Sequence, residues 1–209
     1  MELRLYDLFL WLVKYGAIEH DMDPDTLLTL KRLDLSGHKI EYIPDEIGLL
    51  TQLHTLNLAN NRLEGLPATL KYLTSLINLD LRRNHLSDLS PLSALNLRSL
   101  NISFNQIRSL EAITEMNELR VLDVSANELV NINSVIDHFK ELRNLNASYN
   151  YIEKFIITSS IETLNLCQNT LYEILGKENL SILRADFSDN MLEDFPSSLF
   201  DSHIHTIDV

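Results

Sequence analysis

Aspartate and asparagine side chains recur along this chain at intervals of about 22 residues, and carboxylates of this kind can carry out acid/base chemistry. The series is Asp34, Asn57, Asp80, Asn101, Asp123, Asn146, Asn165, Asp186 and Asp208. On neighbouring strands about 4.8 Å apart, stacked carboxylates would shift one another's pKa values. Asparagine interrupts most of the series, however, and acid/base catalysis also needs a pocket. We therefore expect these side chains to make structural hydrogen bonds on a strand surface.

The other reactive side chains are too sparse to indicate a catalytic or metal site. Cys167 is the single cysteine, and its expected neighbours, Ser148 and Ser188, supply neither a base nor a positive charge to stabilise a thiolate. His203 and His205 would share one face of a strand, but third and fourth metal ligands are not evident. The five glycines are too dispersed to form a phosphate-binding loop. We predict no catalytic residue, no metal and no cofactor.

An eleven-residue pattern, typified by LHTLNLANNRL at 53–63, positions these side chains. Its first, fourth, sixth and eleventh residues are apolar, and its ninth is almost always asparagine. Positions four and six lie two apart, so on a strand they point into the core while positions three, five and seven point outward. The pattern begins at Leu30, Leu53, Leu76, Leu97, Leu119, Leu142, Ile161 and Ile182, and a ninth copy begins at Ile204.

The ninth position is predicted to be structural. Its residues are His38, Asn61, Asn84, Asn105, Asn127, Asn150, Asn169 and Asn190. An asparagine amide both donates and accepts hydrogen bonds, so it can satisfy turn backbone that the strand leaves unpaired. One repeat is too small to bury its leucines alone, and stacking the repeats joins them into a continuous core.

These repeats resemble the leucine-rich repeat family over roughly residues 30–209. The resemblance implies an α/β fold, a right-handed solenoid with a parallel sheet on its concave face, and a role in binding protein. The segment EYIPDEIGLLTQ is similar to the 23-residue repeat class, whereas SDLSPLSAL is similar to the 21- to 22-residue class of bacterial internalins and of a cytosolic phosphatase regulator. His38, Ala147, Ala185 and the short seventh repeat depart from the pattern.

The segment before the repeats predicts an amphipathic helix that caps the core, so we expect a helical cap at 1–29 and repeats at 30–209 in one continuous domain. Its apolar face comprises Leu5, Leu8, Phe9, Leu12 and Gly16. Trp11 lies on the opposite face of the helical wheel, where it either folds back onto the first repeat or is an exposed contact residue. Eight repeats are complete and the ninth is truncated, so either the chain is part of a longer protein or another element covers this end.

The composition of the chain limits the classes of partner it is expected to bind and the cellular compartment in which it is expected to occur. A net charge of −13 argues against nucleic acid, and the sequence contains no membrane-spanning run. One cysteine leaves no internal disulfide, which favours a reducing compartment. We expect a cytoplasmic protein, or one in the host-cell cytosol if it is a translocated bacterial effector.

Interface energy concentrates in arginine and aromatic residues, so outward residues of these types are the candidate partner-binding site. They are Arg82, Arg83, Arg98, Phe104, Arg120, Arg143 and Tyr149, with Trp11 as a secondary candidate. The leading hypothesis is a non-enzymatic module that binds a folded partner protein through its concave face, as a bacterial effector or as a regulator or inhibitor of one. The alternative is the recognition domain of a larger enzyme whose catalytic part lies beyond residue 209. Neither hypothesis includes a small-molecule substrate, nucleic acid or a membrane.

Overall fold

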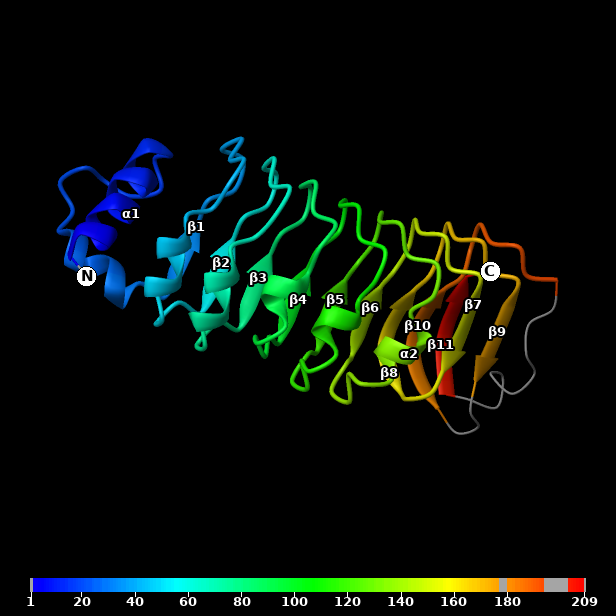
Figure 1. Cartoon of the computed structure of the whole chain (residues 1–209). Coiled ribbons are helices and arrows are strands. Elements are labelled where there is room, and N and C mark those ends of the chain that lie inside the picture. Colours follow the sequence, from blue (N-terminus) through cyan, green and yellow to red (C-terminus); the bar gives the residue numbers. More distant parts are fainter. Residues whose placement is uncertain (1, 177–179, 194–202, 209) are drawn as a thin grey trace.

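The chain folds into a row of stacked coils, each with a short strand on one side and a return segment on the other (Figure 1). The computed structural model describes residues 2–176, 180–193 and 203–208, with the backbone alone at 2, 3, 203–205 and 207. Within these residues one parallel sheet contains nine strands in the order β1-β2-β3-β4-β5-β6-β8-β10-β11. They are β1 (Arg32–Asp34), β2 (Thr55–Asn57), β3 (Asn78–Asp80), β4 (Ser99–Asn101), β5 (Val121–Asp123), β6 (Asn144–Asn146), β8 (Ile161–Asn165), β10 (Ser181–Asp186) and β11 (His203–Asp208).

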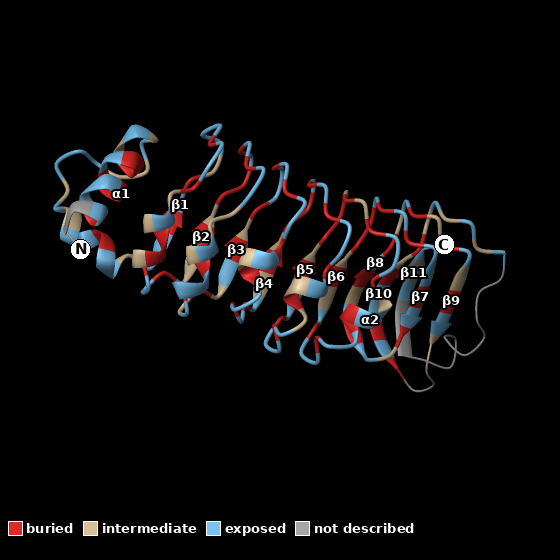
Figure 2. Ribbon diagram, in the orientation of Figure 1, coloured by how far each residue is buried: buried red, intermediate tan, exposed pale blue. Residues whose placement is uncertain are grey.

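The register of the sheet follows the repeat pattern. Position-four leucines lie opposite one another on successive strands, as in the pairs Leu33 with Leu56 and Leu56 with Leu79. These leucines and those at position six are buried, so the predicted inward positions are confirmed. Ala147 and Ala185, which replace core leucines, are buried as well. The core runs as a continuous layer along the stack (Figure 2).

The return side changes character along the stack. The turn η1 (Pro24–Thr29) lies between α1 (Glu2–Lys14) and the first repeat. The first five repeats return through short helical turns, which are η2 (Asp45–Leu49), η3 (Ala68–Tyr72), η4 (Ser90–Leu92), η5 (Glu111–Ile113) and α2 (Asn133–Ile136). The next two repeats return instead through β7 (Lys154–Ile157) and β9 (Glu173–Gly176), which pair as a second parallel sheet. In β7, Phe155 and Ile157 are buried and alternate with exposed Lys154 and Ile156, so this segment has the period-two burial of a strand.

The asparagine column is confirmed as a structural ladder. Asn105 accepts a hydrogen bond from the Leu86 N–H at 3.0 Å through Oδ1. Its Nδ2 donates to the Leu81 carbonyl of the preceding repeat and to the Ile102 carbonyl of its own repeat, both at 3.0 Å. The same three bonds recur at Asn84, Asn127, Asn150, Asn169 and Asn190. His38 stands in the first repeat, which has no earlier repeat of this pattern to bond, and is exposed.

The predicted capping helix is α1 (Glu2–Lys14), and its apolar side chains Leu5, Leu8, Phe9 and Leu12 are buried. The helix ends at Lys14, and the φ of 66° at Gly16 allows the Ala17 N–H to bond the Leu12 carbonyl at 3.0 Å. Trp11 is also buried, with its ring 4.9 Å from that of Tyr15 and 6.5 Å from that of Tyr42 in the first repeat. Its interpretation as an exposed contact residue is therefore wrong, and the alternative, that it packs on the first repeat, is confirmed. Among the described residues no helix is long and apolar enough to cross a membrane.

Candidate protein-binding face

The position-five side chains hold the turn that follows each strand. Asn101 Oδ1 accepts hydrogen bonds from both the N–H (3.0 Å) and the hydroxyl (2.7 Å) of Ser103. Asp123 binds Ser125 in the same way, with distances of 3.0 and 2.6 Å. These bonds confirm a structural role for the Asp/Asn series. They also correct the expectation that position seven points outward for Ala59, Ser103, Ser125 and Ser148, which are buried in the turn, whereas Arg82 at the same position is exposed.

Two carboxylates of this series have shifted pKa values of opposite sign. The Ser36 N–H, which donates to Asp34 at 2.9 Å, holds the pKa of that carboxyl below its usual range. Burial raises the pKa of Asp80, although its bond from the Arg82 N–H and its ion pair with the Arg82 side chain at 3.3 Å act in the other direction. Asp80 is therefore the strand carboxylate with the larger desolvation cost of the two.

The outward side of the nine-stranded sheet, here called the sheet face, is shallow and polar. It corresponds to the concave face that the resemblance implies. Its hollow has a volume of about 290 Å³ and is lined by Thr55, Leu56, Asn57, Asn78, Leu79, Asp80, Ser99 and Asn101. Small-molecule pockets typically enclose about 300–1,000 Å³ and are mostly apolar. An open hollow at the lower limit of that range, lined largely by polar residues, is better suited to side chains of a partner protein.

Three predicted arginines form a row immediately before the strands. The Arg120 N–H donates to the Arg98 carbonyl and the Arg143 N–H to the Arg120 carbonyl, both at 2.9 Å, so the three lie on consecutive repeats. Arg98 pairs with Glu118 at 3.0 Å and Arg143 with Glu162 at 3.5 Å. Arg120 has no ion pair within the part of the chain that the structure describes, so its charge is available to a partner.

Position eight forms a second row beyond the other end of the strands. We call this row the rim: Gly37, Asn60, Arg83, Phe104, Ala126, Tyr149, Gln168 and Asp189. Every rim residue has a φ between 52° and 75°, the left-handed region in which side chains are disfavoured. Phe104 and Tyr149 nevertheless carry large rings that are 49% and 59% exposed.

The structure thus separates the predicted site residues into two groups. Arg98, Arg120 and Arg143 precede the strands, whereas Arg82, Arg83, Phe104 and Tyr149 follow them. Arg82 is tied to Asp80, while the guanidinium carbon of Arg83 lies 4.6 Å from the centre of the Phe104 ring. The two rows bracket the sheet face at its opposite margins, and the buried Trp11 belongs to neither.

The rim conformation was not foreseen from the sequence, and Ala126 was missed with it. The sequence signal for it was Gly37 and Asn60 at position eight, because both residue types favour positive φ. In later repeats position eight is occupied by Arg83, Phe104 and Tyr149, whose residue types do not indicate a positive φ. Ala126 has no functional group that would mark it as a site residue in the sequence. Its relevance follows only from the structure, which places it between Phe104 and Tyr149.

The remaining reactive side chains that the structure describes are the Cys167 thiol and the scattered His, Asp and Glu residues. Burial raises the pKa of the Cys167 thiol, and the negative charge of Asp186 adds to that effect, so the reactive thiolate is disfavoured. Among the described residues no three His, Cys, Asp or Glu side chains are placed to share a metal ion. The side chains of His203 and His205 lie outside the described part of the chain.

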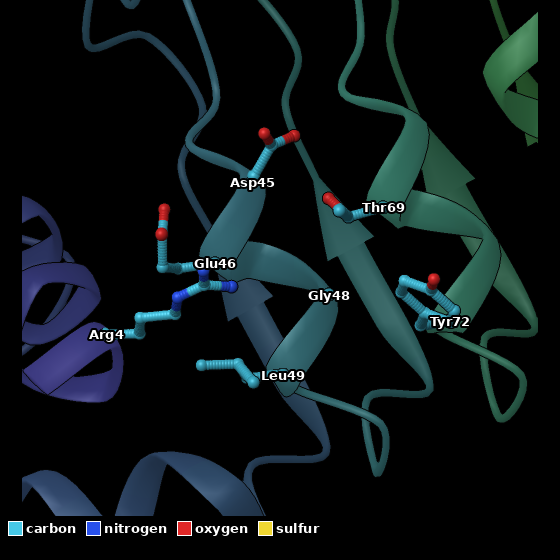
Figure 3. A pocket seen from close by; sticks show the side chains of 7 residues that line it. All are labelled: Arg4, Asp45, Glu46, Gly48, Leu49, Thr69 and Tyr72. Atoms are coloured by element: carbon cyan, nitrogen blue, oxygen red, sulfur yellow. The ribbon is translucent and has the colours of Figure 1, made fainter. Parts of the chain in front are cut away.

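A pocket of about 210 Å³ lies between α1 and the turns η2 and η3 (Figure 3). Arg4, Asp45, Glu46, Gly48, Leu49, Thr69 and Tyr72 line it. Gly48 allows the close approach of the two turns, since a Cβ there would lie 2.7 Å from the Thr69 carbonyl oxygen. The pocket is smaller than a typical ligand site, and we interpret it as a packing gap between cap and repeats.

Stacked strand–turn–return units with an asparagine ladder define a repeat solenoid, in which each repeat completes the core of its neighbours. The family model of the leucine-rich repeat region matches residues 19–200, and the chain belongs to the leucine-rich repeat family.

Two curated relatives share part of this region. The chain is 32% identical over 121 residues to the zebrafish (Danio rerio) transforming growth factor beta activator LRRC33, an alignment that covers 54% of this chain and 18% of that protein. It is also 32% identical over 123 residues to the mouse (Mus musculus) leucine-rich repeat serine/threonine-protein kinase 1, covering 51% of this chain and 6% of the kinase. The chain thus matches less than a fifth of the length of either relative.

Solved structures show the same fold at low sequence identity. The leucine-rich repeat domain of APL1B has a TM-score of 0.71 and 18% identity, covering 88% of this chain and 73% of that one. A chain of the LRIM1/APL1C complex has a TM-score of 0.72 and 19% sequence identity, and the match covers 88% of this chain and 40% of that one. The internalin inlF of Listeria monocytogenes has a TM-score of 0.59 and 20% sequence identity, and the match covers 90% of this chain and 64% of that one. Leucine-rich repeat folds are typically interaction modules, which places the general role of this chain in protein–protein interaction.

Proposed function

We propose that this chain is a non-enzymatic module that binds a folded partner protein across its sheet face. The observation that supports this most strongly is the pair of exposed rows at the two margins of that face. The arginine row presents the charge of Arg120, which has no ion pair among the described residues, and the rim presents the rings of Phe104 and Tyr149. Arginine and aromatic side chains are the residue types that dominate interface energies.

The dimensions of the face suit such an interface. Strands about 4.8 Å apart give the nine-stranded sheet a length near 40 Å, which is enough for the roughly 800 Å² that each partner contributes to a standard interface. The polar, mixed-charge face between the rows favours specificity and a fast encounter over raw hydrophobic affinity. A folded protein that touches both rows would cover the polar floor between them.

The test is capture of a binding protein from lysate of the source organism, followed by affinity measurement with variants of the captured pair. Arg120→Glu and Tyr149→Ala, one in each row, should each weaken binding at least about tenfold, as interface anchors do. Lys71→Glu in η3 and Tyr172→Ala before β9 are matched controls on the return side and should leave the affinity unchanged. Loss of binding in the controls with retention in the face variants would refute the proposal.

A second candidate is the recognition part of a larger enzyme, and the similarity to the mouse kinase supports it, since that relative is far longer than the matched segment. Sequencing the complete transcript tests it, because a reading frame that continues into a catalytic domain would favour this candidate. The bacterial effector role and the cytosolic location stay predictions. The likeness to internalins, at 20% identity, shows the fold alone.

A further inference from the structure

At the centre of the rim, Ala126 lies between two residues with exposed rings, and the space above Ala126 is here called the slot. Phe104, Ala126 and Tyr149 occupy the same position on three consecutive repeats and have nearly identical φ values of 54°, 52° and 55°. Consecutive backbone bonds of 2.9 and 3.0 Å join Phe104 to Ser125, Ala126 to Ser148 and Tyr149 to Cys167. Their Cα–Cβ bonds are therefore held nearly parallel, and the backbones of Phe104 and Tyr149 are about 10 Å apart. The methyl group of Ala126 is the floor between them.

The neighbours on either side leave this slot open. The guanidinium of Arg83, from the third repeat, lies over one face of the Phe104 ring, and this contact leaves the opposite face uncovered. On the far side, Gln168 donates a hydrogen bond to Asp189 within the rim. Tyr149 has no ring contact within the part of the chain that the structure describes.

Size and charge together specify the occupant. Two rings whose backbones are about 10 Å apart leave room for one planar group between them, and stacked rings prefer centre separations of about 4.5–7 Å. A cation in the slot is disfavoured, because Arg83 already places a positive charge against the Phe104 ring. Arg83 itself has no carboxylate partner among the described residues and faces solvent in a protein of net charge −13.

We infer that the rim binds an extended segment of the partner protein, with an aromatic side chain between Phe104 and Tyr149 and an acidic side chain against Arg83. The inference rests on the proposed function and identifies one part of the partner. Arg83 lies two repeats from Ala126, about 10 Å, which an extended segment spans in three residues. The acidic and aromatic residues should therefore be three positions apart in the partner.

The experiment titrates short peptides into the isotope-labelled chain and follows its backbone amide resonances. Acetyl-Asp-Gly-Gly-Trp-amide and the reverse-order acetyl-Trp-Gly-Gly-Asp-amide are the probes, and acetyl-Lys-Gly-Gly-Trp-amide is the charge-reversed control. One of the aspartyl peptides should shift the amides of Phe104, Ala126 and Tyr149 and bind about fivefold tighter than the lysyl peptide. Absence of these shifts, or equal binding of the lysyl peptide, would overturn the inference.

A filled slot supplies the second arm of the test. Ala126→Gln places in the slot a residue that the rim already accepts at position 168 with φ of 54°, so the fold is preserved. This variant should lose peptide binding, whereas Gln168→Ala, outside the slot, should retain it; binding by Ala126→Gln as tight as the parent would contradict the inference. If Arg120→Glu weakens partner capture but the peptides do not bind, the slot is refuted as a binding site and the proposed function stands. If the peptides bind but substitutions in the arginine row and in the rim leave partner capture unchanged, the proposed function is refuted and the slot stands.

Discussion

Arg83 lies over the ring of Phe104 on the next repeat, 4.6 Å from its centre, and both residues have positive φ. The pair is exposed, so its aromatic ring contributes little to the core. Phe104 therefore has a large side chain in a turn conformation that disfavours it, with little core packing to offset that cost.

Phe104→Ala should therefore weaken partner binding while changing the free energy of unfolding by less than about 1 kcal/mol. Phe104→Gly should be more stable than Phe104→Ala by about 0.5–1 kcal/mol, because glycine adopts positive φ without steric cost. Urea unfolding of the parent and both variants gives these differences. A loss of several kcal/mol in either variant would place the ring in the core.

The asparagine ladder gives a second prediction. Asn105→Leu leaves the Leu86 N–H and the Leu81 and Ile102 carbonyls without their side-chain partner. Unpaired buried polar groups cost about 1–3 kcal/mol each, so we expect a loss of about 3 kcal/mol or more. His38→Leu is the control in the same column, because His38 is exposed and makes no side-chain hydrogen bond among the described residues. Equal stability of both variants in thermal unfolding would contradict the structural role of the ladder.

Much of the fold could be predicted from the sequence because the repeat pattern averages over many copies. The inward leucines and the Asn ladder follow from a spacing that recurs from repeat to repeat. The capping helix follows from its apolar face. Trp11 shows the limit of a helical wheel, since Tyr42 of the first repeat covers a side of α1 that the wheel assigns to solvent. The β7–β9 sheet depends on pairing between neighbouring return segments, which a single segment does not encode.

The structure changes the expected placement of the candidate site residues, and their role as partner contacts stays a prediction. Arginine and aromatic residues were identified as anchors, but Arg120 and Tyr149 lie at opposite margins of the sheet face, not in one patch. The reason is the turn after each strand. The backbone N–H of position seven, as in Ser125, donates to the position-five side chain, and the next residue takes the positive φ of the rim.

Close packing of two return turns gives a third prediction. In Gly48→Ala the new Cβ would lie 2.7 Å from the Thr69 carbonyl oxygen and 2.9 Å from its Cβ. Relief requires η2 and η3 to move apart, at a cost of about 1–3 kcal/mol. Gly65→Ala is the control, since a Cβ added there would meet nothing within 4 Å, and it should be neutral or stabilise by up to about 1 kcal/mol. Chemical unfolding that ranks Gly65→Ala as the less stable variant would contradict this packing.

Asp80 and Asp34 give a paired prediction with opposite signs. Burial raises the pKa of Asp80 above its ordinary 3.8, so the folded state binds this proton more tightly than the unfolded state. The stability that this provides is present at low pH and is lost as pH rises through the raised pKa. Asp80→Asn keeps an oxygen for the Arg82 N–H, as Asn101 does for Ser103, and removes the charge. Its stability relative to the parent should increase with pH, ending within about 1 kcal/mol of it at neutral pH.

For Asp34 the bond from the Ser36 N–H lowers the pKa, so its ionised form stabilises the fold above the ordinary pKa and that contribution is lost on acidification. Asp34→Asn should therefore become less stable relative to the parent as pH rises. Urea unfolding of the parent and both variants between about pH 3 and 7 measures the two slopes. The opposite signs separate the local effect of each carboxyl from any change common to removing a charge from an acidic protein. Slopes of the same sign would show that overall charge, not the desolvation of Asp80 and the turn bond of Asp34, controls the pH dependence.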